Sequence, residues 1–245
     1  MIVAHRGASK DAPENTIPAF LLAWEQGADA IEGDFHLTKD GHIVCIHDGD
    51  TKRVANTNMV VRNSTLADLR TLSIVHDQEN EPKVTVIPTI AEVLAIIPQG
   101  KTIYVEVKCG VEIIPGLLME IDKSGLKEDQ VVFISFKEAV IQELKARAPQ
   151  YKTSWLCSFN KQKSGAITPS SETVLSTLER IRADGLSSNI TVPESLIETL
   201  RKQGYKWHVW TVDEPNTAKR MKALGAASIT TKAPRIIKEA ETGMF

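Results

Sequence analysis

Short runs rich in β-branched and aromatic residues alternate with longer stretches of helical periodicity along nearly the whole chain. Such alternation is typical of parallel α/β folds, because parallel strands need a crossover connection, usually a helix. We predict strands at Ile2–His5, Ala30–Phe35, Ile103–Lys108, Val131–Phe136, Tyr151–Leu156, Ala183–Ser187, Lys206–Thr211 and Ala227–Thr230. The helices predicted to follow them are Thr16–Glu25, Thr89–Ile97, Ile113–Asp122, Lys137–Ala148, Glu172–Ile181, Glu194–Gln203, Glu214–Leu224 and Pro234–Glu241.

The number of strand–helix units predicts the architecture. Eight such units favour a closed (β/α)8 barrel, the TIM barrel, and a doubly wound open sheet is the alternative. The chain has 245 residues, which lies within the range of a single barrel domain. We therefore predict one TIM-barrel domain over residues 1–245.

Two features interrupt the alternation after the second predicted strand. A further β-rich run, Ile43–His47, follows too closely for a crossover helix, so we predict a β-hairpin through Asp40-Gly41. The next segment, Asp48–Pro88, is polar and too long for an ordinary connection, and it contains one short helical pattern at Leu66–Leu72. We expect this segment to be a small insertion over the top of the barrel.

Composition and charge exclude several classes of protein. Hydrophobic residues make up 42% and charged residues 24%, and a net charge of −2 provides no polycationic surface for nucleic acid. The chain has no apolar run long enough for a transmembrane helix and no signal-peptide pattern at its start. Cys45, Cys109 and Cys157 lack metal-binding or redox spacing, and we expect Cys109 to serve packing. We expect a cytoplasmic protein.

Polar residues occupy the ends of the first predicted strands. They form the motifs His5-Arg6-Gly7, Glu32-Gly33-Asp34, His47-Asp48 and Glu106-Val107-Lys108. In a (β/α)8 barrel the carboxyl ends of the strands face the active site, so these motifs are the first candidates for chemistry. Period-two alternation directs both acids of the second motif to one face of their strand.

The hairpin connects two of these motifs. A turn centred on Lys39-Asp40 or on Asp40-Gly41 would set either Glu32 or Asp34 across from His47. We therefore expect a histidine beside two carboxylates.

The acids and bases of this set are suited to phosphate chemistry. Glu32, Asp34 and Glu106 provide an all-oxygen set that suits a hard cation such as Mg²⁺ or Ca²⁺ better than zinc. Arg6 and Lys108 add positive charges that fit a phosphate ester. His5 and His47 are able to move protons near neutral pH. The combination indicates acid–base cleavage of a phosphodiester.

Each piece also has a structural explanation when it is taken alone. His5 could be a hydrogen-bonded core histidine, and Gly7 could serve only a turn. Glu106 and Lys108 could form a structural ion pair. Two acids on one strand face are harder to explain, because burying them without a partner costs several kcal/mol. Taken together, the motifs favour the functional interpretation.

The order of the motifs resembles that of the glycerophosphodiester phosphodiesterases. The resemblance extends from Ala4 to Pro234, and its first half is the more specific. It rests on His5-Arg6-Gly7, Pro13-Glu14-Asn15-Thr16, Glu32-x-Asp34, Leu37-Thr38-Lys39-Asp40-Gly41, His47-Asp48, Glu106-x-Lys108, Ser135-Phe136 and Trp210-Thr211-Val212.

This resemblance implies a role for each matching residue. Glu32, Asp34 and Glu106 would bind a divalent metal, Mg²⁺ or Ca²⁺, and His5 and His47 would be the acid–base pair. Arg6 and Lys108 would hold phosphate oxygens. Glu14 and Asn15 would order the first loop, and Phe136 and Trp210 would line the pocket.

The implied reaction is hydrolysis of a glycerophosphodiester, a small molecule, to sn-glycerol 3-phosphate and an alcohol. The alternatives are a lysophospholipase D-like phosphodiesterase and a catalytically silent barrel that binds a phosphorylated metabolite. Three points stay open: the metal, which histidine is the acid, and whether water or the neighbouring glycerol hydroxyl attacks. No oligomeric state is predicted. Lys232 departs from the family pattern, in which an acid is usual, and this bears on the pocket rim and the head group.

Overall fold

The computed structural model describes residues 1–74 and 85–242 and shows a closed barrel of parallel strands. The ring runs β1-β11-β10-β9-β6-β5-β4-β2 and closes because β1 pairs with both β11 and β2. This closure confirms the predicted TIM barrel, and the open-sheet alternative is wrong. The barrel strands are β1 (Ile2–His5), β2 (Ala30–Leu37), β4 (Thr102–Val107), β5 (Val131–Ser135), β6 (Lys152–Cys157), β9 (Gly185–Ser188), β10 (Lys206–Val209) and β11 (Ser228–Thr231).

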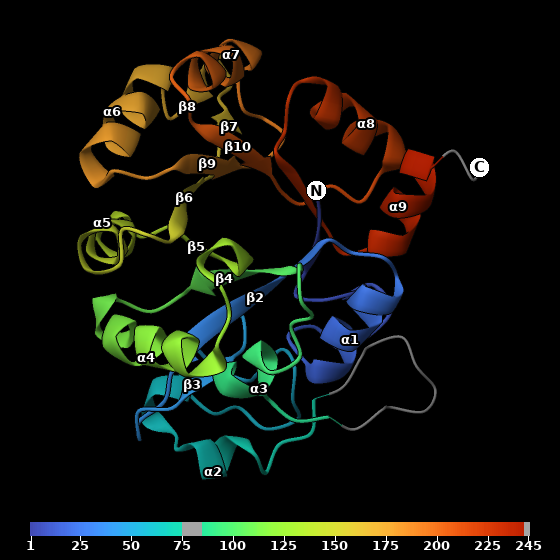
Figure 1. Cartoon of the computed structure of the whole chain (residues 1–245), viewed down its shortest axis with the longest axis vertical. Coiled ribbons are helices and arrows are strands. Elements are labelled where there is room, and N and C mark those ends of the chain that lie inside the picture. The colour runs from blue at the N-terminus through green and yellow to red at the C-terminus, as the bar shows by residue number, and fades with distance from the viewer. Residues whose placement is uncertain (75–84, 243–245) are drawn as a thin grey trace.

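Helices surround the strands (Figure 1). They are α1 (Ile17–Glu25), α3 (Ile90–Leu94), α4 (Ile114–Ser124), α5 (Glu138–Arg147), α6 (Ser171–Ile181), α7 (Glu194–Lys202), α8 (Pro215–Ala223) and α9 (Pro234–Thr242), with short 3-10 turns at Val111–Ile113 and Glu128–Gln130. Thr16 and Thr89 cap α1 and α3 with their side chains, so both helices begin one residue later than predicted. None of the helices in the described residues has the length and apolar character needed to cross a membrane.

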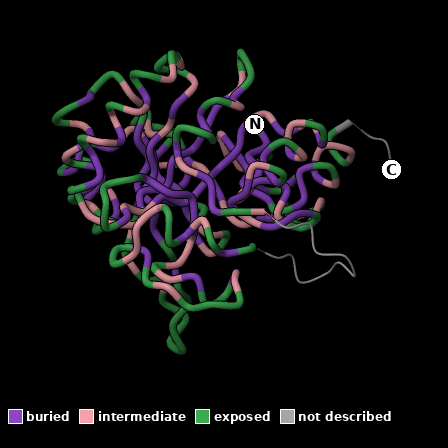
Figure 2. Tube along the Cα trace, turned by 90° about the horizontal axis from the view of Figure 1, so that it is seen from below, coloured by how far each residue is buried: buried purple, intermediate pink, exposed green. Residues whose placement is uncertain are grey.

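Buried residues follow the central strands, and exposed residues follow the outer helices and loops (Figure 2). Side chains on the outer face of the strands pack against the helices in two large apolar clusters. A smaller cluster fills the barrel interior and contains Val3, Ala30, Tyr104, Ile134 and Leu156. Residues two positions further along several of these strands therefore also point inward and lie nearer the mouth.

The predicted hairpin is present, but its register differs from both predicted registers. Strand β3 (Ile43–Cys45) pairs antiparallel with β2, and the Ile46 N–H donates to the Asp34 carbonyl at 2.9 Å. The connecting loop is centred on Asp40 itself, rather than on a peptide bond beside it. Asp34 therefore lies opposite Ile46, and the prediction that His47 lies directly across from one of the acids is wrong.

The described part of the insertion has a small core of its own. A 3-10 turn at Val61–Asn63 and helix α2 (Leu66–Leu69) belong to it, and its apolar side chains pack against those of β3. Thr65 and Asp68 form a capping box that starts α2. Residues 75–84 of the predicted Asp48–Pro88 insertion lie outside the described residues. The assignment of residues 1–245 to one domain stays a prediction.

A short hairpin between β6 and α6 was not predicted. It consists of β7 (Asn160–Lys161) and β8 (Ile167–Thr168), and most of its residues are exposed. Strands of two residues are too short to produce a recognisable alternation of apolar and polar positions.

Candidate active site at the barrel mouth

Three acidic side chains converge inside the barrel. Glu32 and Asp34 lie on β2, and Glu106 lies on the neighbouring β4, where it is in register with Asp34. Their carboxylates lie within 4.8 Å of one another, and all three residues are at most 8% exposed. The structure therefore brings together the three residues predicted to bind a metal.

Two cations and an amide contact these acids. Arg6 Nε lies 3.1 Å from Asp34 Oδ2, and Lys108 Nζ lies 2.7 Å from Glu106 Oε1. The Asn15 side-chain amide donates to Asp34 Oδ2 at 2.9 Å, and the Arg6 backbone N–H donates to Glu32 Oε2 at 3.0 Å. The acids are thus oriented by fixed donors as well as by their strands.

The first loop needs an unusual backbone to provide these contacts. Arg6 and Asn15 both have a φ of 57°, in the left-handed region, and the Asn15 N–H donates to the Arg6 carbonyl at 3.0 Å. Gly7 also has a positive φ, of 81°, and a Cβ there would lie 2.6 Å from the Ala19 backbone. The motif therefore requires glycine at position 7, because this loop passes very close to α1.

The two predicted histidines contact different partners at the site. His5 Nε2 is 3.9 Å from Glu32 Oε2, and its Nδ1 is 3.5 Å from the Thr211 hydroxyl. His47 Nδ1 is 2.7 Å from Asp48 Oδ1. Both rings line the same cavity, so they can reach one bound molecule.

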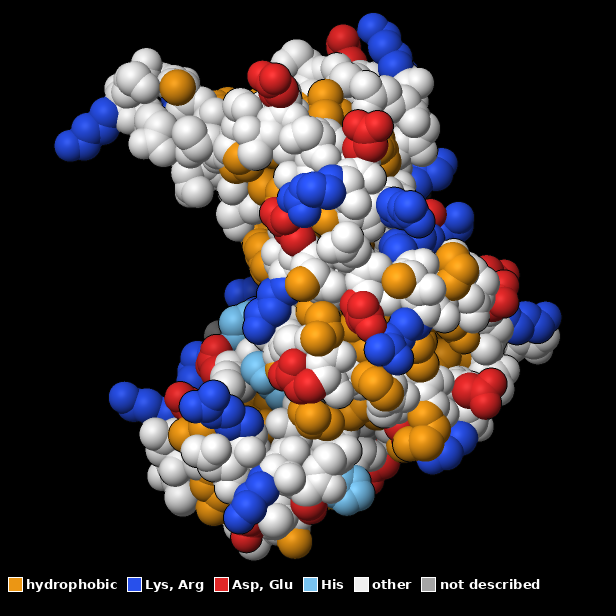
Figure 3. All heavy atoms as spheres, turned by 90° about the vertical axis from the view of Figure 1, so that its left-hand side faces the viewer, with side chains coloured by type: hydrophobic (Ala, Val, Ile, Leu, Met, Phe, Trp, Pro, Cys, Tyr) orange, Lys and Arg blue, Asp and Glu red, His pale blue; other side chains and the backbone are white. Residues whose placement is uncertain are grey.

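A cavity of about 360 Å³ opens at the carboxyl ends of the strands. The molecule is visibly hollowed along one edge in Figure 3, and histidine and Lys or Arg side chains gather at the lower border of this hollow. The predicted residues that line the cavity are His5, Arg6, Glu32, His47, Glu106, Lys108, Phe136 and Trp210. Asp34, Glu14 and Asn15 lie behind this surface, in contact with Arg6. The Phe136 and Trp210 rings form an edge-to-face pair with centroids 5.7 Å apart.

Several lining residues were missed by the sequence analysis. Tyr104 and His208 point into the cavity with their rings 5.7 Å apart, and Ser158, Ser187, Thr211 and Thr230 add hydroxyl groups. Tyr104 lies two residues before Glu106, and His208 lies two residues before Trp210. Period-two alternation could therefore have found both.

Burial in this mixed charge environment shifts several pKa values. Burial and the charge of Asp34 raise the pKa of Glu106 to about 7, and burial with the same neighbouring charge raises that of Glu32. Burial alone would raise the pKa of Asp34, but Arg6 and Lys108 outweigh it and hold that pKa below its ordinary value. Burial and Arg6 lower the pKa of His5 to about 3. The acids therefore need another positive charge, a proton or a cation, to compensate them fully.

Lys232 lies beside the site in the connection between β11 and α9. Its backbone N–H donates to Asp213 Oδ1 at 2.8 Å, and its carbonyl accepts from the Lys10 N–H at 3.1 Å. Lys232 is exposed, and its charge contributes to the low pKa of His5. Lys232, the residue that departs from the family pattern, therefore lies close enough to His5 for its charge to affect that ring.

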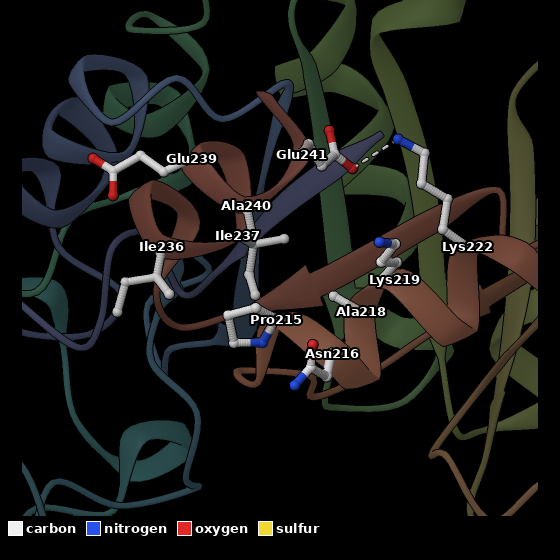
Figure 4. A pocket seen from close by; sticks show the side chains of 10 residues that line it. All are labelled: Pro215, Asn216, Ala218, Lys219, Lys222, Ile236, Ile237, Glu239, Ala240 and Glu241. Carbon is white, nitrogen blue, oxygen red and sulfur yellow. Dashed lines mark hydrogen bonds and ion pairs between the residues drawn. The ribbon is translucent and has the colours of Figure 1, made fainter. Parts of the chain in front are cut away.

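A larger hollow, of about 1010 Å³, lies between α8 and α9 (Figure 4). An ion pair between Lys222 and Glu241, at 2.9 Å, spans part of it. None of the predicted site residues lines it. Size alone therefore does not identify the active site.

The fold and the site together define a barrel hydrolase of phosphate diesters. The family model of the glycerophosphoryl diester phosphodiesterase family matches residues 5–236. The chain belongs to this family, and the predicted enzyme class, a phosphoric diester hydrolase, is confirmed.

Relatives and solved structures of this family resemble the whole chain. A glycerophosphodiester phosphodiesterase from Caldanaerobacter subterraneus subsp. tengcongensis is 34% identical over 97% of this chain and 96% of its own. A glycerophosphodiester phosphodiesterase from Thermotoga maritima has a TM-score of 0.78 and 25% identity, with 97% of this chain and 96% of that chain covered. A phosphodiesterase from Oleispira antarctica was solved in complex with the product sn-glycerol-3-phosphate. It has a TM-score of 0.85 and 24% identity, with 99% of this chain and 96% of that chain covered.

Proposed function

We propose that this enzyme hydrolyses glycerophosphodiesters to sn-glycerol 3-phosphate and an alcohol with the help of a divalent cation, Mg²⁺ or Ca²⁺. The observation that carries the proposal is the convergence of Glu32, Asp34 and Glu106 in a cavity that two histidines and two cationic side chains also line. The family membership and the product named for the Oleispira antarctica protein support the choice of substrate.

The three acids fit a hard cation. All donors are carboxylate oxygens, the groups that Mg²⁺ and Ca²⁺ prefer. Glu32 Oε1 is buried and has no hydrogen-bond partner among the described residues, so one ligand position is available. When bound, the cation would supply positive charge that polarises the phosphate and neutralises the developing negative charge.

The cationic side chains and the aromatic pair bind and orient the substrate in this proposal. Arg6 and Lys108 compensate the phosphate oxygens from two sides, while Phe136 and Trp210 form the apolar wall of the pocket. Glu14 and Asn15 hold Arg6 and Asp34, so they keep the first loop in its strained conformation.

The histidines move the protons. The Asp48 carboxylate contacts His47 Nδ1 and holds the ring in place, which leaves the other ring nitrogen of His47 to donate a proton to the leaving alcohol oxygen. His5, beside Glu32, accepts the proton of the attacking hydroxyl. That hydroxyl belongs either to water or to the adjacent glycerol carbon, in which case water opens the resulting cyclic phosphate. In both routes one water is consumed and the P–O bond to the alcohol breaks. The two routes therefore give the same products, sn-glycerol 3-phosphate and the alcohol.

The test measures the phosphomonoester released with Mg²⁺, Ca²⁺ or EDTA. This product is glycerol 3-phosphate from glycerophosphocholine and glycerophosphoethanolamine, and lysophosphatidic acid from a lysophospholipid. We expect release from the first two substrates with a metal and none with EDTA. Glu106→Gln is expected to remove the metal-dependent activity, whereas Glu198→Gln, which changes an exposed acid of α7, is expected to leave it intact. No release with either metal would overturn the proposal. Preferred hydrolysis of the lysophospholipid to lysophosphatidic acid would support the lysophospholipase D-like alternative, for which Phe136, 45% exposed at the mouth, is the favourable feature.

A further inference from the structure

Arg53, in the insertion, holds two carboxylates at once. Its Nη1 and Nη2 donate to the two oxygens of Glu14 at 2.9 and 2.7 Å, and its Nε donates to Asp48 Oδ2 at 2.7 Å. A paired contact of this kind fixes the angle of the carboxylate as well as its distance. Glu14 belongs to the loop after β1 and Asp48 follows β3, so one side chain ties together two loops that are distant in the sequence.

Both carboxylates also contact residues that the proposed function uses. Glu14 Oε1 accepts from Arg6 Nη1 at 3.0 Å, and Asp48 Oδ1 lies 2.7 Å from His47 Nδ1. The five side chains form a continuous chain of alternating basic and acidic groups with Arg53 at its centre. One end holds the proposed phosphate-binding arginine, and the other end holds the proposed proton donor.

The contact with Asp48 decides which nitrogen of His47 faces the substrate. With Nδ1–H directed at the carboxylate, Nε2 is the ring nitrogen left for the cavity. However, the Asp48 and His47 side chains are 35% and 31% exposed, and an exposed pair is weak on its own because water competes for both partners. Arg53 counters this freedom by holding the second oxygen of Asp48.

We propose that Arg53 is a positioning residue that sets the orientation of His47 for proton transfer to the leaving oxygen and, through Glu14, the orientation of Arg6. This inference rests on the proposed function. Arg53 does not line the cavity, so it acts on the reaction through its two partners. Its hydrogen bonds to Glu14 hold the pKa of Arg53 above its ordinary value, so the guanidinium keeps its charge throughout the working range.

The test compares Arg53→Gln with wild type on two glycerophosphodiesters, one with choline and one with p-nitrophenol as the leaving alcohol. Nitrophenolate leaves without a proton, whereas choline needs one. We expect kcat for the choline substrate to fall about 10- to 100-fold and kcat for the nitrophenyl substrate to fall less than about threefold. KM is expected to rise by the same factor for both substrates, because Arg6 is loosened in both cases.

Three further variants separate positioning from a general loss of structure. Arg70→Gln removes an arginine of the same insertion that pairs with Glu92 away from the cavity, and it should change neither kcat. Arg53→Lys keeps the charge without the paired geometry and should restore only part of the loss. In an Asp48→Asn background, Arg53→Gln should lower kcat for the choline substrate less than about threefold further, since the two residues act in series.

The outcomes distinguish this inference from the proposed function. Equal losses of kcat on the two substrates, or no loss on the choline substrate, would overturn the positioning role. If wild type releases glycerol 3-phosphate from neither substrate, the proposed function itself fails. The ¹⁵N shifts of the His47 ring then decide the role of Arg53: a changed tautomer in Arg53→Gln supports it, and unchanged shifts refute it.

Discussion

The free energy of unfolding of the metal-free enzyme is expected to fall as the pH rises, because Glu106 loses its proton. Burial and the charge of Asp34 raise the pKa of Glu106 to about 7, compared with an ordinary value of 4.5. Because the folded state binds this proton more tightly, the stabilisation is fully present below a pH of about 4.5 and is lost as the pH rises through about 7. A difference of about 2.5 pH units corresponds to about 3 kcal/mol.

The assay is urea unfolding of EDTA-treated wild type and Glu106→Gln, followed by tryptophan fluorescence between pH 4.5 and pH 8. The buried histidines titrate in both proteins, so the difference between the two largely removes their contribution. The free energy of unfolding of Glu106→Gln, relative to wild type, should rise by about 3 kcal/mol over this range. Glu198→Gln serves as the control and should show no pH-dependent difference. A pH-dependent change below about 1 kcal/mol, or one of opposite sign, would refute the reasoning.

The remaining predictions concern the chemistry and the metal. His47→Ala should lower kcat by about 10²- to 10⁴-fold with the fold intact by circular dichroism, and near wild-type turnover would contradict its role. Lys232→Asp should favour glycerophosphocholine over glycerophosphoglycerol a few-fold in kcat/KM at low salt, because an exposed charge acts weakly and is screened; an unchanged ratio would remove Lys232 from selectivity. A crystal grown with Ca²⁺ should hold the ion about 2.3–2.6 Å from oxygens of Glu32, Asp34 and Glu106, and carboxylates too far apart to share one ion would refute the site.

The sequence alone was sufficient to predict the barrel and to bring most residues of the candidate site to one mouth. Strand and helix periods are local properties, so the alternation of apolar runs was sufficient to predict the (β/α)8 class. Within a barrel, every strand presents its carboxyl end at the same mouth. The motifs that begin at His5, Glu32 and Glu106 could therefore be assigned to one cavity before any contact was known.

The tertiary structure decided the relations between segments that are distant in the sequence. The hairpin register depends on where the loop centres, at Asp40, and a shift of one position changes every cross-strand neighbour. Alternation from Glu106 and Trp210 could have assigned Tyr104 and His208 to the cavity, but the contact between their rings, with centroids 5.7 Å apart, comes only from the fold.

The role of Arg53 and the pKa values were likewise decided only by the fold. Arg53 carries no local signal, because its partners Glu14 and Asp48 come from separate loops that meet only in three dimensions. The pKa of Glu106 depends on burial and on the charge of Asp34 across two strands. Both effects arise from distances between side chains, which a linear pattern does not contain, and for that reason the electrostatics of the site belong to the folded protein alone.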